Sequence, residues 1–225
     1  MEQRKLNIGL KQNPNKANLH ILVGQAGAGK TTILQNILEN TSNTPIVLWN
    51  RHQPTKYYPE DFSKDIERFV SNVLSIDFKF DYFLPENFYY EDYCMVKIGQ
   101  YEYIVNGKHI ERYGSPEPLQ YVVNLITVIY RMLYEEYTSG TQWLVDSELS
   151  HIPNQQFTFL IDDTENYINT RAKQTLLLQL QSTFPNGNIF CTAYNACVSE
   201  GIKDAWIYDI QKGETINPIS TNQKQ

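Results

Sequence analysis

Cysteine is scarce in this sequence, and its few copies form no pattern. Cys94, Cys191 and Cys197 are an odd number without C-x-x-C spacing, which argues against a disulfide framework or a cysteine zinc site and favours a reducing compartment. The four histidines are scattered, so no histidine metal cluster is expected. No stretch approaches the roughly 20 apolar residues that span a bilayer, and the N-terminal residues lack the apolar core of a signal peptide. We therefore expect a cytoplasmic protein without a membrane-spanning part.

An excess of positive charge is also missing. The formal net charge of −6 argues against a protein that coats nucleic acid through a general basic field, although it does not bear on a local basic groove. A length of 225 residues suits one domain, or a core that carries one sizeable insertion. The hydrophobic share of 41% is enough for a packed core.

Apolar runs of strand length alternate with helical patterns along the chain. In the segments 31–40 and 116–137, apolar residues recur at helical spacing, and the second segment opens with a proline, as helix N-termini allow. Asn106-Gly107 separates two strand-like runs, as in a type I′ hairpin. Strands that alternate with helices predict an α/β fold with a mainly parallel, covered sheet. The expected strands are 18–23, 45–49, 157–161, 188–192 and 205–210, and further helices are expected at 61–74 and 171–184.

A phosphate-loop pattern lies between the first predicted strand and helix. The segment Gly24–Thr31 matches G-x-x-x-x-G-K-[ST] in every fixed position. Its glycines let backbone N–H groups turn inward around an anion, and the helix N-terminus adds partial positive charge. Lys30 is placed to reach the β- and γ-phosphates, Thr31 to ligate Mg²⁺ and Thr32 to touch the α-phosphate. The pattern predicts a P-loop NTPase core for ATP and Mg²⁺. The expected nucleotide-binding residues of the loop are Gly24, Gln25, Ala26, Gly27, Ala28, Gly29, Lys30, Thr31 and Thr32.

A pair of acidic residues follows a later strand. A P-loop requires a second carboxylate on the magnesium side, at the tip of a neighbouring strand, and the hydrophobic run 157–161 ends in Asp162 and Asp163. Asp162 is expected to bind the metal directly or through water. Asp163 is the candidate for orienting or deprotonating the attacking water, and Glu165 is the alternative for that role.

The distance along the chain between these groups separates the P-loop branches. Lys30 and Asp162 are 162 − 30 = 132 residues apart, which is longer than is usual in small kinases, GTPases and hexameric motors. A guanine-recognition motif is also missing. The separation predicts a partly helical subdomain, inserted at about 50–140, as in ABC-type ATPases.

Two segments resemble a known family. Phe159–Ile168, FLIDDTENYI, resembles the "LLIDEPENHL" segment of small soluble ABC-class ATPases with an AAA domain, relatives of the SMC, Rad50 and RecF group and of the overcoming-lysogenization-defect type. Asn188–Asn195 lies where that family carries "QIIFTTHSP", and 205–210 is similar to its closing strand. With the P-loop, the resemblance covers about a third of the chain. It implies that two protomers sandwich ATP, and that the closing and opening of this dimer regulate an effector protein in genome maintenance or anti-phage defence.

The resemblance also assigns single residues. Ser115 stands where the family carries the signature serine that contacts the nucleotide of a partner subunit; the alternative is a turn that opens the long helix. Asp163 replaces the catalytic glutamate and Ala193 replaces the switch histidine, which favours slow or partner-dependent hydrolysis. Asn195 either senses the terminal phosphate or caps a turn. Two other functions stay open: a nucleotide-dependent switch or structural subunit with little turnover, and a small-molecule phosphotransferase.

Overall fold

A mostly parallel sheet forms the centre of the computed structural model, which describes residues 15–41, 45–49, 62–83, 100–111, 114–137, 151–162, 167–202 and 204–216. The sheet has six strands in the order β2-β6-β7-β1-β8-β9, and only β9 runs antiparallel to its neighbour. The predicted α/β fold with a mainly parallel sheet is confirmed. The strands are β1 Asn18–Val23, β2 Ile46–Trp49, β6 Phe157–Ile161, β7 Gly187–Ala193, β8 Ala205–Asp209 and β9 Glu214–Ile216.

The strand that precedes the glycine loop lies inside the sheet. β1 pairs in parallel with β7 on one side and with β8 on the other, so Val23 lies opposite both Ala193 and Asp209. Its side chains alternate between two apolar clusters: Leu19 and Ile21 face the larger one, and Leu22 faces the smaller one. Burial on both faces is why this strand reads as a continuous apolar run.

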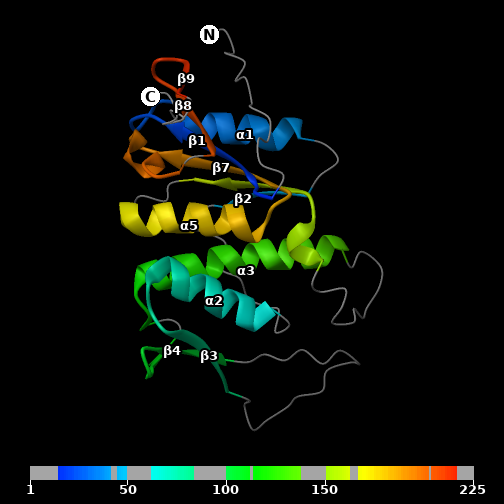
Figure 1. Ribbon diagram of the computed structural model, residues 1–225, viewed down its shortest axis with the longest axis vertical. Coiled ribbons are helices and arrows are strands. Elements are labelled where there is room, and N and C mark those ends of the chain that lie inside the picture. Colours follow the sequence, from blue (N-terminus) through cyan, green and yellow to red (C-terminus); the bar gives the residue numbers. More distant parts are fainter. Residues whose placement is uncertain are drawn as a thin grey trace, which may run out of the picture.

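The helices cover the two faces of the sheet unequally. α1 (Lys30–Asn40) leads from β1 to β2 and packs on one face, where Leu34 joins the smaller cluster. α5 (Thr170–Thr183) leads from β6 to β7 and packs on the opposite face. Figure 1 shows the resulting order of layers: α1, the sheet, α5, then two more helices and a small second sheet. The opposite placement follows from right-handed crossovers, because the two connections step along the sheet in opposite directions.

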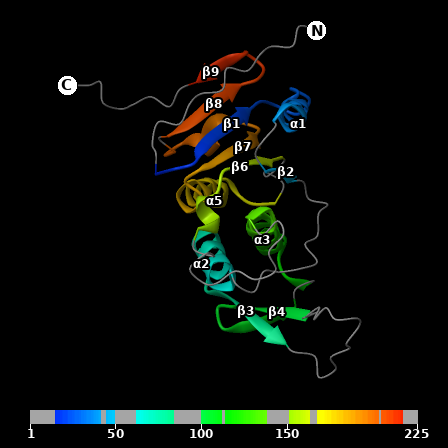
Figure 2. The ribbon, with the colours of Figure 1, turned by 90° about the vertical axis from the view of Figure 1, so that its right-hand side faces the viewer.

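The residues between β2 and β6 build the outer layers. α2 (Ser63–Leu74) contacts both α3 (Glu117–Tyr137) and α5, and Figure 2 shows these three helices between the two sheets. The second sheet is antiparallel, with the order β3-β4-β5. Its inner face buries Phe78, Phe80 and Tyr103, whose rings contact one another edge to face. Its strands are β3 Phe78–Phe83, β4 Gln100–Val105 and β5 Lys108–Glu111.

Several helices and strands have bounds close to those predicted from the sequence pattern. The first strand and the 157–161 strand have the expected bounds, and the long helix begins at Glu117, directly after Pro116. The expected hairpin exists as β4–β5, and Asn106 and Gly107 have φ angles of 50° and 75°, as a type I′ turn requires. β3 and β9 were not expected. β3 pairs with β4 across a long stretch of chain, which no local pattern reports. No helix among the described residues is long and apolar enough to cross a membrane.

A buried histidine lies within the face that α1 covers. His20 is 1% exposed, and its ring stacks on Phe190 with the centroids 4.3 Å apart. Its Nδ1 lies 3.1 Å from the hydroxyl of Tyr208. Burial lowers the pKa of His20 to about 4, because an imidazolium would lose its hydration there. The native state therefore holds this ring neutral.

This burial predicts acid sensitivity. The folded pKa of about 4 lies below the ordinary value of about 6.5, so stability is lost as the pH falls from about 6.5 towards 4. Between pH 7.5 and pH 5 the loss attributable to His20 is about 2 kcal/mol of unfolding free energy. Urea denaturation of the wild type and of His20→Gln at both pH values measures it. The variant should lose less stability than the wild type on acidification, and equal losses would contradict the assignment.

Candidate functional site

A cavity of about 450 Å³ opens at the carboxyl ends of the central strands. It lies between the loop that follows β1, the end of β6 and the end of β7. In parallel sheets these ends meet at one edge, which is where α/β proteins place their ligand sites. The lining residues are Ala26, Gly27, Ala28, Gly29, Lys30, Thr31, Thr32, Asp162, Thr192 and Tyr194.

Two glycines give the loop its shape. Gly27 and Gly29 have φ angles of 79° and 89°, in the left-handed region that L side chains rarely adopt. Gly24 lies in a tight place for a different reason: a Cβ atom there would lie 3.0 Å from the Cβ of Ala28, closer than most such contacts. The loop then passes directly into α1 at Lys30, so the first N–H groups of this helix lie at the cavity. These groups have no acceptor within the helix.

Lys30 is held by neutral groups. Its ammonium donates hydrogen bonds to the carbonyl oxygen of Gly24 and, over 3.0 Å, to that of Gln25. It also lies 4.9 Å from the centre of the Tyr194 ring, on its face. The positive charge is thus kept at the cavity by carbonyl dipoles and a π-system.

The carboxylate of Asp162 is shared by two hydroxyl groups. Thr31 Oγ1 donates to Asp162 Oδ2 over 2.7 Å, and Thr192 Oγ1 donates to Asp162 Oδ1 over 2.9 Å. The three residues come from the start of α1, the end of β6 and the end of β7. Each oxygen of the carboxylate therefore has a fixed direction, and the strand ends are tied together.

Most residues expected at a phosphate site meet at this cavity. Its lining includes the expected loop residues from Ala26 to Thr32, and Asp162. Gly24 and Gln25 contact Lys30 through their carbonyl oxygens. Asp163 and Glu165, expected to activate water, lie outside the described residues.

Three further residues, Ser115, Ala193 and Asn195, were assigned from the family resemblance. Ser115 is 6% exposed and does not line the cavity; its carbonyl oxygen accepts a hydrogen bond from Gln120 Nε2 at the start of α3. Ala193 is fully buried in β7, and the residues that line the cavity at this strand end are Thr192 and Tyr194. Asn195 caps the short η5 helix (Ala196–Ser199), since its Oδ1 accepts from Cys197 N. The capping alternative for Asn195 is thus the one realised.

Sequence reasoning missed Thr192 and Tyr194 as site residues. A signal for both existed, because they end a buried strand that is parallel to the strand before the glycine loop. This signal identifies the two residues only when the order of the strands in the sheet is known. β7 pairs with both β1 and β6, and this adjacency brings Thr192 beside Asp162.

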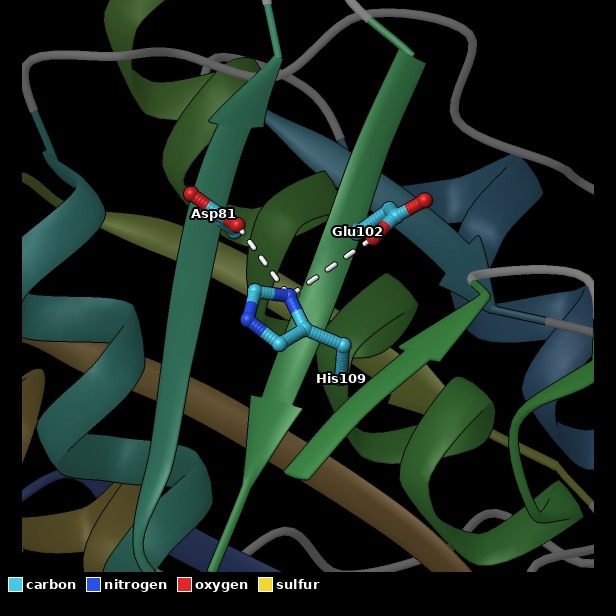
Figure 3. Close-up of side chains that lie close together, drawn as sticks. All are labelled: Asp81, Glu102 and His109. Carbon is cyan, nitrogen blue, oxygen red and sulfur yellow. Dashed lines mark ion pairs between the residues drawn. The ribbon is translucent and has the colours of Figure 1, made fainter. Parts of the chain in front are cut away.

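A second cluster of charged side chains lies on the small sheet (Figure 3), and none of its members lines the cavity. His109 Nδ1 lies 3.2 Å from Asp81 Oδ2 and 3.7 Å from Glu102 Oε2. Asp81 and Glu102 are directly opposite on β3 and β4, where like charges are unfavourable. The imidazole thus bridges two carboxylates across three strands. The three ligand atoms lie within 4.8 Å of one another, so the set could also hold a metal ion.

No protein-family model matches this chain, and a search of curated proteins found no match.

The loop geometry predicts a cost for adding a side chain at Gly29. Gly29→Ala places a Cβ on a residue with a φ angle of 89° and should lower the unfolding free energy by about 1–2 kcal/mol. Gly114→Ala is the matched control, because a Cβ there meets only ordinary contact at 3.9 Å. Its stability should stay within about 0.5 kcal/mol of the wild type or rise. Urea denaturation compares the two, and equal losses would contradict the described loop.

Proposed function

We propose that this chain binds ATP with Mg²⁺ at the cavity beyond β1, and that it hydrolyses ATP as a P-loop protein of the ABC type. The observation that supports the proposal is the meeting of a glycine loop, a lysine and a carboxylate held by two hydroxyls at one sheet edge. The chain leaves β1 towards α1 on one face and leaves β6 towards α5 on the other. Such a divergence opens the crevice in which α/β proteins bind nucleotides.

The electrostatics of the cavity suit a polyphosphate. The N-terminus of α1 directs unpaired N–H groups and partial positive charge towards the cavity. Lys30 donates hydrogen bonds to the neutral carbonyl oxygens of Gly24 and Gln25. Exchanging these for phosphate oxygens would give the ammonium anionic acceptors, which bind it more strongly. The volume of about 450 Å³ lies within the usual range for small-ligand sites, about 300–1,000 Å³.

The donor atoms at the cavity also fit magnesium. Thr31 and Asp162 supply a hydroxyl and a carboxylate oxygen that already lie 2.7 Å apart, and Mg²⁺ prefers such hard oxygen ligands together with phosphate and water. Bound there, the ion would neutralise phosphate charge. Thr192 fixes the second carboxylate oxygen, so the carboxylate keeps its orientation whether or not an ion is bound.

One observation favours a second candidate function, a nucleotide-dependent switch with little turnover. Asp162 carries the only carboxylate among the described residues that line the cavity, and it is assigned to the metal. Water activation then depends on Asp163 or Glu165, or on a partner. The proposed dimer would need Ser115, which is 6% exposed, to become accessible before it could contact a nucleotide held by a second copy. In both functions the nucleotide state would be read by an effector protein.

Replacing Lys30 tests the proposed site directly. Lys30→Ala should weaken binding of a fluorescent ATP analogue at least tenfold and abolish ATP turnover, because it removes the cation expected on the phosphates. Lys212→Ala is the matched control. This exposed lysine follows β8, pairs with Asp209 at the end of that strand and does not line the cavity. Unchanged binding by Lys30→Ala would overturn the proposed function.

Turnover at several protein concentrations separates the two candidates. A specific rate that rises with concentration and vanishes in Lys30→Ala is expected for a composite dimer site. Tight ATP binding without phosphate release would instead support the switch.

Replacing Asp162 should separate the contribution of magnesium to nucleotide affinity from the contribution of the loop itself. Asp162→Asn removes a proposed metal ligand and a negative charge near the phosphates, so affinity with Mg²⁺ should fall about tenfold or more while affinity in EDTA is kept or rises. Asp204→Asn is the control, since Asp204 pairs with Lys16 at the opposite end of the sheet. Calorimetric titration with and without Mg²⁺ measures both. Equal losses in the two conditions would contradict the metal role.

A further inference from the structure

α5 carries two fully buried polar side chains, and each bonds the main chain at one end of the central sheet. Gln181, 2% exposed, donates from Nε2 to the carbonyl oxygens of Ala17 and Asp204, which lie just before β1 and β8. Lys173, 1% exposed, donates from Nζ to the carbonyl oxygen of Thr192 over 2.7 Å, near the end of β7. Lysine is almost never fully buried unless it is paired. Lys173 thus bonds the carboxyl end of the sheet, and Gln181 bonds its amino end.

The carbonyl that Lys173 binds lies near the carboxyl end of β7, where it also accepts a bond from Cys191 Sγ over 3.4 Å. Ala193 O accepts from Gly24 N on the β1 side, so the preceding carbonyl, that of Thr192, points towards β6. β6 ends at Ile161, which lies opposite Cys191. The Thr192 carbonyl is thus one residue past the last β6 partner. Lys173 bonds it from the α5 face of the sheet.

The same threonine holds the proposed metal-side carboxylate. Thr192 is 1% exposed, and its hydroxyl donates to Asp162, whose other oxygen accepts from Thr31. A continuous series of contacts therefore runs from α5 through Lys173, Thr192 and Asp162 to the glycine loop. α5 in turn contacts α2 of the outer layer. The series crosses the sheet from the face that carries the outer layers to the cavity.

We infer that Lys173 is a positioning residue for the magnesium side of the nucleotide site: by fixing Thr192, it orients the carboxylate of Asp162. The inference rests on the proposed function. Lys173 does not line the cavity, and its bond to the Thr192 carbonyl is the contact through which we expect it to act on Asp162. Its loss should therefore change how strongly the site uses magnesium, and should leave the metal-independent contacts of the glycine loop intact.

The experiment is a magnesium titration of ATP-analogue binding by the full chain. In Lys173→Met, the Mg²⁺ concentration for half-maximal enhancement of binding should rise about tenfold, while affinity in EDTA stays within about twofold of the wild type. Methionine keeps the apolar stem and removes the charge and the donors. Gln181→Leu is the matched control on the same helix: it removes a buried polar group at the opposite sheet end, so its melting temperature should fall with no shift in magnesium dependence.

A second variant keeps the test decisive if Lys173→Met does not fold. Thr192→Val retains the carbonyl that Lys173 binds and removes the hydroxyl that holds Asp162, so it should show the same rise in the magnesium requirement. Wild-type magnesium dependence in Thr192→Val or in folded Lys173→Met would overturn the inference, as would an equal shift in Gln181→Leu. These results leave the proposed function standing, because the Lys30→Ala comparison tests that function separately. Absence of nucleotide binding by the wild type would overturn both.

Discussion

The carboxylate of Asp162 is the contact on which the site depends, because it joins parts of the chain that are distant in sequence. Thr31 and Asp162 are separated by 131 positions, yet their side chains lie 2.7 Å apart. Thr192 holds the other carboxylate oxygen. A charged group shared by two hydroxyls has little freedom to rotate, so the ends of β6 and β7 and the start of α1 keep one arrangement. Whatever binds beyond β1 meets a preformed edge.

α5 connects this edge to the rest of the molecule. It lies against the central sheet on one side and contacts α2 on the other. Lys173 and Gln181 fasten it to main-chain carbonyls near the carboxyl and amino ends of the sheet. Because Lys173 and Gln181 are 181 − 173 = 8 positions apart in this 14-residue helix, a slide or tilt of α5 would strain one of the two bonds. α5 thus contacts the outer layer on one side and the strand ends near the cavity on the other.

The described residues between β2 and β6 form a packed layer with many aromatic contacts. Phe62 stacks on Tyr130 with the ring centroids 4.7 Å apart, and Phe78 contacts Tyr103 edge to face. These rings join α2 to α3 and cover the inner face of the small sheet. The abundance of tyrosine and phenylalanine in the described part of this segment is explained by packing. Asp81, Glu102 and His109 lie together on the small sheet (Figure 3), and none of them lines the cavity.

The sequence by itself determined most of the local elements and, within the site, the glycine loop and Asp162. A buried parallel strand is marked by a mainly apolar run, and the glycine loop is marked by residues that tolerate a positive φ angle. For this reason β1, the loop and α1 could be predicted from the sequence between Asn18 and Asn40. Only the tertiary structure decided that β7 lies between β1 and β6. Because β7 lies beside β6, Thr192 lies next to Asp162. The ammonium of Lys173 on α5 bonds the carbonyl oxygen of the same threonine. Spacing along a chain reports which face of an element is apolar, whereas the neighbour of a strand is set by packing of the whole sheet.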